Sequence, residues 1–100
     1  MDVAEQLAQA IIERRLAACV SFLPGATSVY RWKSGVCRDA EVWIMIKTTS
    51  QMYSELQSLW CDLHPYDVPE LLAVSVADGF PPYISWLQAQ VGTPLPGAAQ

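Results

Sequence analysis

The sequence has little charge of either sign, and the charge it has is mostly acidic. Six Lys and Arg stand against ten Asp and Glu, which gives the 100-residue chain a formal net charge of −4 at pH 7. Proteins that bind nucleic acid need basic residues gathered on one face to neutralise the phosphates. The composition therefore excludes nucleic acid as an expected partner.

Long apolar runs are also missing. No apolar run is longer than Val42–Ile46, whereas a helix that crosses a bilayer needs roughly 20 predominantly apolar residues. The first residues show no basic segment followed by an apolar one, which is the pattern of a secretory leader. We therefore expect no membrane span and a cytoplasmic protein.

Cysteine and histidine are too few for several kinds of site. The three cysteines, Cys19, Cys37 and Cys61, are an odd number with no close pair, so we expect free thiols rather than disulfides or a zinc knuckle. His64 is the only histidine, and only Cys61 is near it in sequence for a nucleophilic Cys–His pair. There is no glycine-rich phosphate loop. We expect no enzymatic activity and no catalytic or cofactor-binding residues.

Apolar residues, by contrast, are abundant. Hydrophobic residues make up 52% of the chain and charged residues only 16%, and four residues are tryptophan. A domain of this size leaves much of its surface exposed, and large aromatic side chains are enriched in the cores of protein interfaces. The composition favours an oligomer over the alternative, which is a tightly packed monomer.

Hydrophobic periodicity predicts the order helix, strand, strand, helix, strand, helix. The apolar run Val42–Ile46 indicates a central strand that is covered on both faces. Pro24-Gly25 predicts a bend or bulge within the first strand. The expected elements are a helix over residues 2–15, strands over 18–32 and 36–48 joined by a turn at 33–35, a helix over 52–63, a strand over 71–76, and a helix over 82–91.

Three sequence blocks occur in an order that resembles the CutA family of divalent-cation-tolerance proteins. They are Arg15–Val20, Ser28–Trp32 and His64–Glu70, and the resemblance extends over residues 3–91. It implies an α+β, ferredoxin-like βαββαβ fold that lacks its N-terminal strand and carries an extra C-terminal helix. It also implies a homotrimer, in which the hairpin at residues 26–48 reaches a neighbouring subunit. We assign residues 1–91 to this domain and residues 92–100 to a disordered tail.

The family begins with a strand, whereas the helical pattern of this chain starts at residue 2. In the ferredoxin-like sheet that first strand is a central one. Its absence would leave the strand at 36–48 without a neighbour on one side and the strand at 71–76 without a partner. Unpaired backbone groups of this kind cost on the order of a few kcal/mol each unless they are satisfied in another way.

His64 is the candidate metal ligand, because imidazole binds copper and other borderline cations. The family is associated with copper and other divalent cations, and its proposed ligands are a cysteine on the missing first strand and the histidine of the His-Pro-Tyr segment. Only His64 matches, and the preceding Leu63 cannot ligate. Alternatively, His64 bonds to the backbone and shapes its loop. Glu70, Lys47 and Tyr66 are polar residues among apolar strands, a pattern typical of a hydrogen-bonded network.

The resemblance implies a trimeric protein that acts in divalent metal tolerance, with copper or another divalent cation as its ligand and a response to metal ions as its role. Two alternatives stay open. The chain could be a small-molecule-binding signalling trimer like the PII proteins, which share the fold. It could also be a scaffold or assembly protein, as suggested for animal members of the family linked to cholinesterase processing.

Overall fold

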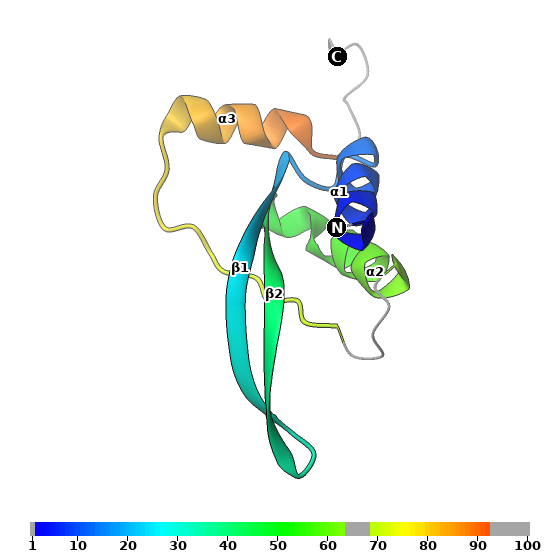
Figure 1. The fold of residues 1–100 in the computed structure, drawn as a ribbon. Coiled ribbons are helices and arrows are strands. Elements are labelled where there is room, and N and C mark those ends of the chain that lie inside the picture. The colour runs from blue at the N-terminus through cyan, green and yellow to red at the C-terminus, as the bar shows by residue number, and fades with distance from the viewer. Residues whose placement is uncertain (1, 64–68, 93–100) are drawn as a thin grey trace.

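The computed structural model describes residues 2–63 and 69–92 and shows an α+β fold. Helices α1 and α2 lie beside one end of a long hairpin, α3 crosses above that end, and the rest of the hairpin projects away from the helices (Figure 1). The molecule is elongated, with dimensions of 56 × 29 × 21 Å. The elements in order are α1 (Asp2–Glu13), β1 (Cys19–Trp32), β2 (Gly35–Lys47), a 3-10 helix η1 (Ser50–Met52), α2 (Tyr53–Leu63) and α3 (Pro81–Gln90).

The hairpin follows the sequence prediction closely. β1 and β2 pair antiparallel, and the chain turns at Lys33 and Ser34. The register shifts between Leu23 and Ala26, where Gly25 adopts a φ of +92° that a side chain would disfavour. The predicted interruption at Pro24-Gly25 is therefore a β-bulge, which increases the local twist of the hairpin.

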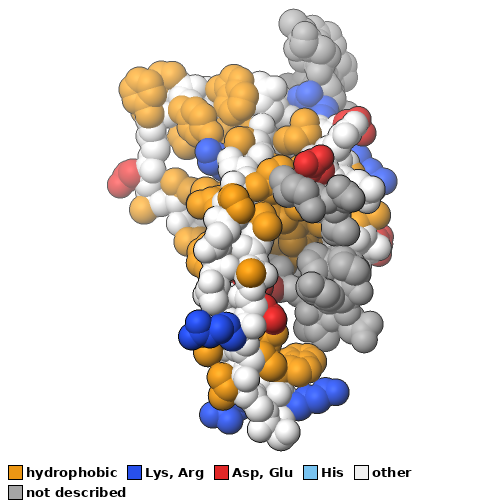
Figure 2. Space-filling model, in the orientation of Figure 1, with side chains coloured by type: hydrophobic (Ala, Val, Ile, Leu, Met, Phe, Trp, Pro, Cys, Tyr) orange, Lys and Arg blue, Asp and Glu red, His pale blue; other side chains and the backbone are white. Residues whose placement is uncertain are grey.

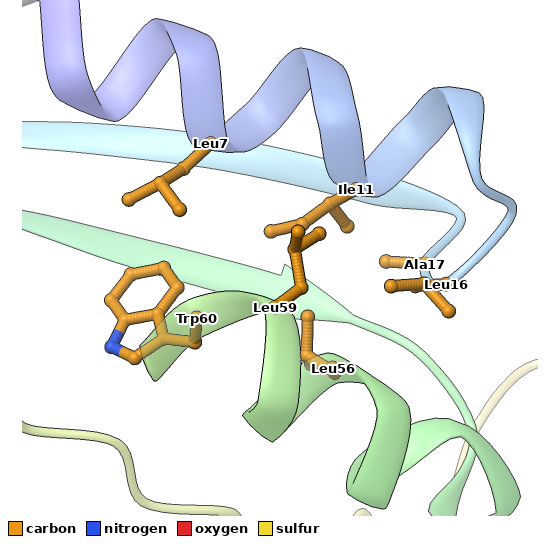
Figure 3. Packing of buried hydrophobic residues seen from close by; sticks show 7 residues of the cluster. All are labelled: Leu7, Ile11, Leu16, Ala17, Leu56, Leu59 and Trp60. Atoms are coloured by element: carbon orange, nitrogen blue, oxygen red, sulfur yellow. The ribbon is translucent and has the colours of Figure 1, made fainter. Parts of the chain in front are cut away.

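A small apolar core joins the two long helices to the open end of the hairpin. Leu7 and Ile11, one helical turn apart on α1, are its most buried side chains. In Figure 3 they point toward Leu59 and Trp60 of α2. The seven buried residues are Leu7, Ile11, Leu16, Ala17, Leu56, Leu59 and Trp60. The partly buried residues packed around them are Ala10, Val20, Ile44, Ile46, Met52 and Leu71.

Helix α3 begins with Pro81 and Pro82, whose fixed φ and missing N–H suit the first turn of a helix. None of its residues is buried. The rings of Tyr83 and Trp86 lie with their centroids 5.6 Å apart, and both side chains are exposed. Across residues 2–63 and 69–92, no helix combines the length and the apolar character that crossing a membrane requires.

The predicted strand at 71–76 does not form. Residues 69–80 have no regular secondary structure, and the sheet of the described residues contains only β1 and β2. The alternating side chains of Leu72, Val74 and Val76 are 81%, 88% and 77% exposed. A β-branched sequence alone does not make a strand, because strand pairing requires a neighbour whose backbone groups complete the ladder. The segment at 71–76 was expected to lack a partner strand, and within the described residues it has none.

β2 was predicted to be central, and in this respect the prediction is wrong for the single chain. Within the described residues β2 pairs with β1 on one edge only. Ile44 and Ile46 pack against the helical core, whereas Trp43 and Met45 on the opposite face are 62% and 51% exposed. The apolar run thus has one covered face and one open face, and its second edge is unpaired.

Candidate functional site

The predicted metal ligand His64 lies outside the described residues, as do Tyr66 and Asp67. The structure does describe the residues on either side. Helix α2 ends at Leu63, and the last residues of the helix, including Cys61 and Asp62, are exposed. This part of the chain therefore presents a thiol and a carboxylate to solvent close in sequence to His64.

The two ends of the segment around His64 are held by α2 and the core. The indole Nε1 of buried Trp60 donates to the carbonyl oxygen of Glu70 at 3.1 Å, and Leu71 packs against the core. The Glu70 side chain itself is exposed. Lys47 is half-buried, and among the described residues it makes no hydrogen bond with Glu70. The predicted polar network is therefore not formed by the two of its members that the structure describes.

Donors for a metal ion are scattered in the described part of the chain. No three His, Cys, Asp or Glu side chains within residues 2–63 and 69–92 lie close enough together to hold a metal ion. Cys19 and Cys37 are half-buried, Cys61 is exposed, and all three are free thiols.

Two small clefts lie where the end of α1, η1 and the end of α3 meet. Their volumes are about 180 Å³ and 350 Å³. Arg15 lines the smaller one, and its backbone adopts a left-handed φ of +57°. The guanidinium of Arg15 donates to the carbonyl oxygens of Ala89 and Gly92, each at 2.8 Å. Arg15 therefore links the C-terminal end of α3 to the end of α1. The smaller cleft is lined partly by Arg15 and Gly92, which hold these two helix ends together.

The hairpin beyond the bulge, residues 26–41, forms an arm with two different faces. Because successive strand side chains point to opposite faces, the register fixes which residues share each face. The acidic face consists of Ser28, Tyr30, Trp32, Cys37, Asp39 and Glu41. The basic face consists of Thr27, Val29, Arg31, Val36, Arg38 and Ala40. Figure 2 shows charged side chains of both signs among apolar ones along this projecting part of the molecule.

Hydroxyl groups of β1 hold the two carboxylates of the acidic face. The Tyr30 hydroxyl donates to Asp39, and the Ser28 hydroxyl donates to Glu41. The hydrogen bond to Asp39, together with desolvation and with repulsion from the Asp39 charge, raises the pKa of Tyr30 from 10.0 to about 12. These contacts order two negative charges on an otherwise exposed surface.

Sequence reasoning did not identify Arg15, Asp39 or Glu41 as functional candidates. For the carboxylates the signal depends on the exact length of the turn. The predicted turn over 33–35 would pair Trp32 with Val36 and would place Ser28 and Tyr30 on the face opposite the two acids. The observed turn has only two residues and pairs Trp32 with Gly35, which places Ser28 and Tyr30 on the same face as the acids. For Arg15 no local pattern reveals contacts with residues at the other end of the chain.

The comparison with protein families gives a match over most of the chain. The sequence profile described as "CutA1 divalent ion tolerance protein" matches residues 1–90. Among known proteins, the chain is 43% identical over 91 residues to the divalent-cation tolerance protein CutA of Thermus thermophilus, covering 91% of this chain and 88% of that one. It is 42% identical over 100 residues to the mouse protein CutA, covering 94% of this chain and 56% of that protein. The chain thus spans about half the length of the mouse relative.

Solved structures agree with these matches. The Thermus thermophilus divalent cation tolerance protein superposes with a TM-score of 0.87, at 43% identity, over 91% of this chain and 88% of the other. The PII-like protein CutA from Nostoc sp. PCC 7120 superposes with a TM-score of 0.83, at 32% identity, over 91% and 88% of the two chains.

Proposed function

The chain belongs to the CutA1 divalent ion tolerance family, and we propose that it contributes to divalent cation tolerance by binding copper or another divalent metal ion as a homotrimer. The proposed role is one of binding rather than catalysis, and the proposed location is the cytoplasm. The observation that carries the homotrimer is the open apolar face of the hairpin. The proposal of metal binding rests on the family membership and on the donor side chains that lie near His64 in the sequence.

The open face supports self-association. Leu23, Trp43 and Met45 project from the face of the sheet that lies opposite the helical core, and each is at least 44% exposed. Trp32 at the end of the arm is 59% exposed. Burying apolar surface of this kind contributes roughly 25 cal/mol for each Å² removed from water. A second and a third copy are the occupants we propose for this face.

The unpaired segment at 71–76 supports the same assembly. Its side chains Leu72, Val74 and Val76 are more exposed than the large apolar side chains of β1 and β2. In the proposed trimer this segment gains backbone partners and completes a larger ferredoxin-like sheet. The gain in burial and in ladder hydrogen bonds would add to the stability of the assembled state.

The proposed metal ligand is His64, assisted by donors near the end of α2. Asp62 and Cys61 are exposed there and differ in softness, so a borderline cation such as copper could use either. One chain supplies a single imidazole. A trimer brings three copies of the segment into one particle, and ligands from neighbouring copies could then complete a site.

Isothermal titration calorimetry with Cu²⁺ and Zn²⁺ tests the metal proposal. We expect saturable binding by the wild type and a loss of about tenfold or more in affinity for His64→Ala, the scale seen when groups that support a metal site are removed. The matched control replaces Cys19 and Cys37 with serine, which leaves the donors proposed near His64 in place, and it should retain binding. If His64→Ala binds as the wild type does and the cysteine variant does not, the thiols are the ligands and His64 is structural.

The second candidate is binding of a small signalling molecule, which the likeness to the PII-like protein of Nostoc favours. A ligand of this kind would bind between copies of the chain. Titration of the purified protein with adenine nucleotides, followed by the fluorescence of its tryptophans, separates this candidate from the first. Saturable nucleotide binding together with absent metal binding would favour it.

A further inference from the structure

The two faces of the arm carry opposite charges in a fixed arrangement. The register pairs Ser28 with Asp39 and Val29 with Arg38. On the acidic face, the carboxylates of Asp39 and Glu41 therefore follow each other along β2. On the basic face, Arg31 and Arg38 occupy diagonal positions across the two strands. Side chains at such positions lie about 7–8 Å apart, so each face presents two like charges as one small patch.

The two patches differ in how their charges are satisfied within one chain. Asp39 and Glu41 accept hydrogen bonds from Tyr30 and Ser28. The side chains of Arg31 and Arg38 are exposed, and neither has a carboxylate partner among the described residues. Carboxylates that are already ordered lose less conformational entropy when a partner binds them. The acidic face therefore presents ordered carboxylates that can accept hydrogen bonds from a cation, and the basic face presents guanidinium groups that can donate them.

We propose that the basic face of the arm in one copy docks on the acidic face of the arm in the next copy. Arg31 and Arg38 of the first copy then pair with Asp39 and Glu41 of the second. This inference rests on the proposed homotrimer and specifies which surfaces meet in it. The occupant of each face is a second copy of this chain.

Charge complementarity determines the symmetry of this contact. A two-fold contact would set a face against its own copy, and like charges brought together in this way are repelled. A contact between the two different faces is heterologous, so each bound copy still offers one free face. Such contacts continue from copy to copy until the ring closes. The arrangement therefore disfavours a two-fold dimer of arms and suits a closed ring such as a trimer.

Apolar side chains on both faces add to the complementarity between the acidic and the basic face of the arm. Val29 and Val36 flank the arginines and are 57% and 70% exposed. Tyr30 and Trp32 lie on the acidic face and are 41% and 59% exposed. Guanidinium groups stack favourably on aromatic rings, and interface cores are enriched in aromatic residues and arginine. Each face thus combines apolar surface with a pair of charges.

Sedimentation velocity at micromolar concentration, at low and at high salt, tests the proposal. The variants are Arg31→Glu/Arg38→Glu, Asp39→Arg/Glu41→Arg, and the quadruple variant that combines them. Each double variant places like charges on both faces, whereas the quadruple variant exchanges the charges and restores complementarity. Glu5→Arg/Glu55→Arg is the matched control, because it reverses two exposed carboxylates on α1 and α2. Circular dichroism checks that every variant folds.

We expect each double variant to require a protein concentration higher by about a hundredfold for assembly, since like charges in an interface cost several kcal/mol and 1.4 kcal/mol is a factor of ten. The quadruple variant should assemble nearly as the wild type does, and the control should not change. Salt should weaken the wild-type assembly as the Debye length shortens. Asp39→Asn/Glu41→Gln, which removes the charges without reversing them, should give an intermediate loss.

The outcomes separate this inference from the homotrimer itself. A wild type that is trimeric and double variants that assemble equally well would overturn the charge-paired contact and leave the trimer standing. A folded quadruple variant that stays as dissociated as the double variants would also overturn it. A wild type that is monomeric at micromolar concentration would overturn both.

Discussion

Arg15 and Gly92, 77 positions apart in the sequence, hydrogen-bond each other in both directions. The Gly92 N–H donates to the Arg15 carbonyl oxygen at 2.8 Å, and Nε of Arg15 donates to the Gly92 carbonyl oxygen at 2.8 Å. Both residues have positive φ, +57° for Arg15 and +78° for Gly92. A non-glycine residue in this conformation costs roughly 1–2 kcal/mol, which the paired hydrogen bonds offset.

The first prediction is that Arg15→Ala loosens α3. The variant loses the two guanidinium hydrogen bonds, one of which reaches Ala89, and keeps the backbone strain. Because hydrogen bonds from charged groups contribute about 1.5–3 kcal/mol each, less when exposed, we expect the free energy of opening α3 to fall by about 2 kcal/mol. Amide hydrogen exchange over residues 81–90 measures this fall.

Two further variants calibrate that result. Arg14→Ala removes an exposed guanidinium beside Arg15 that makes no hydrogen bond within the described residues, and should change the opening free energy by less than about 0.5 kcal/mol. Arg15→Lys keeps the charge but lacks the planar guanidinium that donates to two carbonyl groups. Its opening free energy should therefore lie between those of Arg15→Ala and Arg14→Ala. Equal exchange in Arg15→Ala and Arg14→Ala would show that packing alone holds α3.

The second prediction concerns the hydroxyl of Tyr30. Because the pKa of Tyr30 is raised to about 12 mainly by its hydrogen bond to Asp39, the folded arm favours the neutral phenol. The stability that this contact contributes is therefore fully present below about pH 10 and is lost as the pH rises toward 12. Asp39→Asn should move the pKa back toward the ordinary value of 10.0.

Spectrophotometric titration, which follows the absorption of tyrosinate as the pH rises, checks this prediction. The difference between the curves of the wild type and Tyr30→Phe isolates the titration of Tyr30 from that of the other three tyrosines. Ser28→Ala is the matched control, because it removes the neighbouring hydrogen bond to Glu41 and leaves Tyr30 bonded to Asp39. An unchanged Tyr30 titration in Asp39→Asn would rule out the contact in solution.

The third prediction separates the roles of two tryptophans. Trp32 is 59% exposed at the end of the arm, and Trp60 is 6% exposed in the core. Trp32→Ala should weaken assembly, measured by light scattering, and leave the far-ultraviolet circular dichroism unchanged. Trp60→Ala should lower the free energy of unfolding by about 3–5 kcal/mol, as large-to-small changes in a core do. If Trp32→Ala unfolds the chain without first dissociating it, the arm belongs to the fold and not to the interface.

The sequence predicted those parts of the fold that depend on local patterns. The bulge at Pro24-Gly25 followed from the missing donor of proline and the free φ of glycine, and the helical stripe of Leu7 and Ile11 followed from a period near 3.6. The pairing of Arg15 with Gly92 could not be predicted, because neither residue carries a local signal for a contact so distant. The strand at 71–76 failed for a different reason, since its formation depends on a partner strand that the sequence pattern does not reveal.

The same reasoning applies to the candidate site. His64 was chosen because it is the only imidazole of the chain and because it matches the histidine of the family's His-Pro-Tyr segment. The two-faced arm depends on the register beyond the bulge between Leu23 and Ala26, and that register is set by the observed two-residue turn, which pairs Trp32 with Gly35. A one-residue slip beyond that bulge would exchange the basic and acidic faces on one strand and separate Tyr30 from Asp39.

The last prediction concerns the unpaired edge of β2. A strand of about six residues rich in Val and Thr, attached ahead of Asp2 through a short loop, matches the typical strand length and has a free edge to pair with. It would pair with β2 near Ile44 and Ile46 and could give residues 71–76 a neighbour on its other side. Buried apolar surface and new ladder hydrogen bonds should then raise the melting temperature, by about 4–8 °C for each kcal/mol gained in a domain of this size.

Aggregation supplies the second readout, because an exposed apolar edge invites pairing with other chains. The extended protein should aggregate less on heating than the 100-residue chain. A control extension of equal length that is rich in Gly and Ser should change neither property, since it forms no strand. If the proteins with either extension have the same melting temperature as the unextended chain, the edge of β2 is already paired in solution. The neighbouring copies of the proposed trimer would then be the partners, and a dilution series that lowers the melting temperature would identify them, because only an assembly makes stability depend on protein concentration.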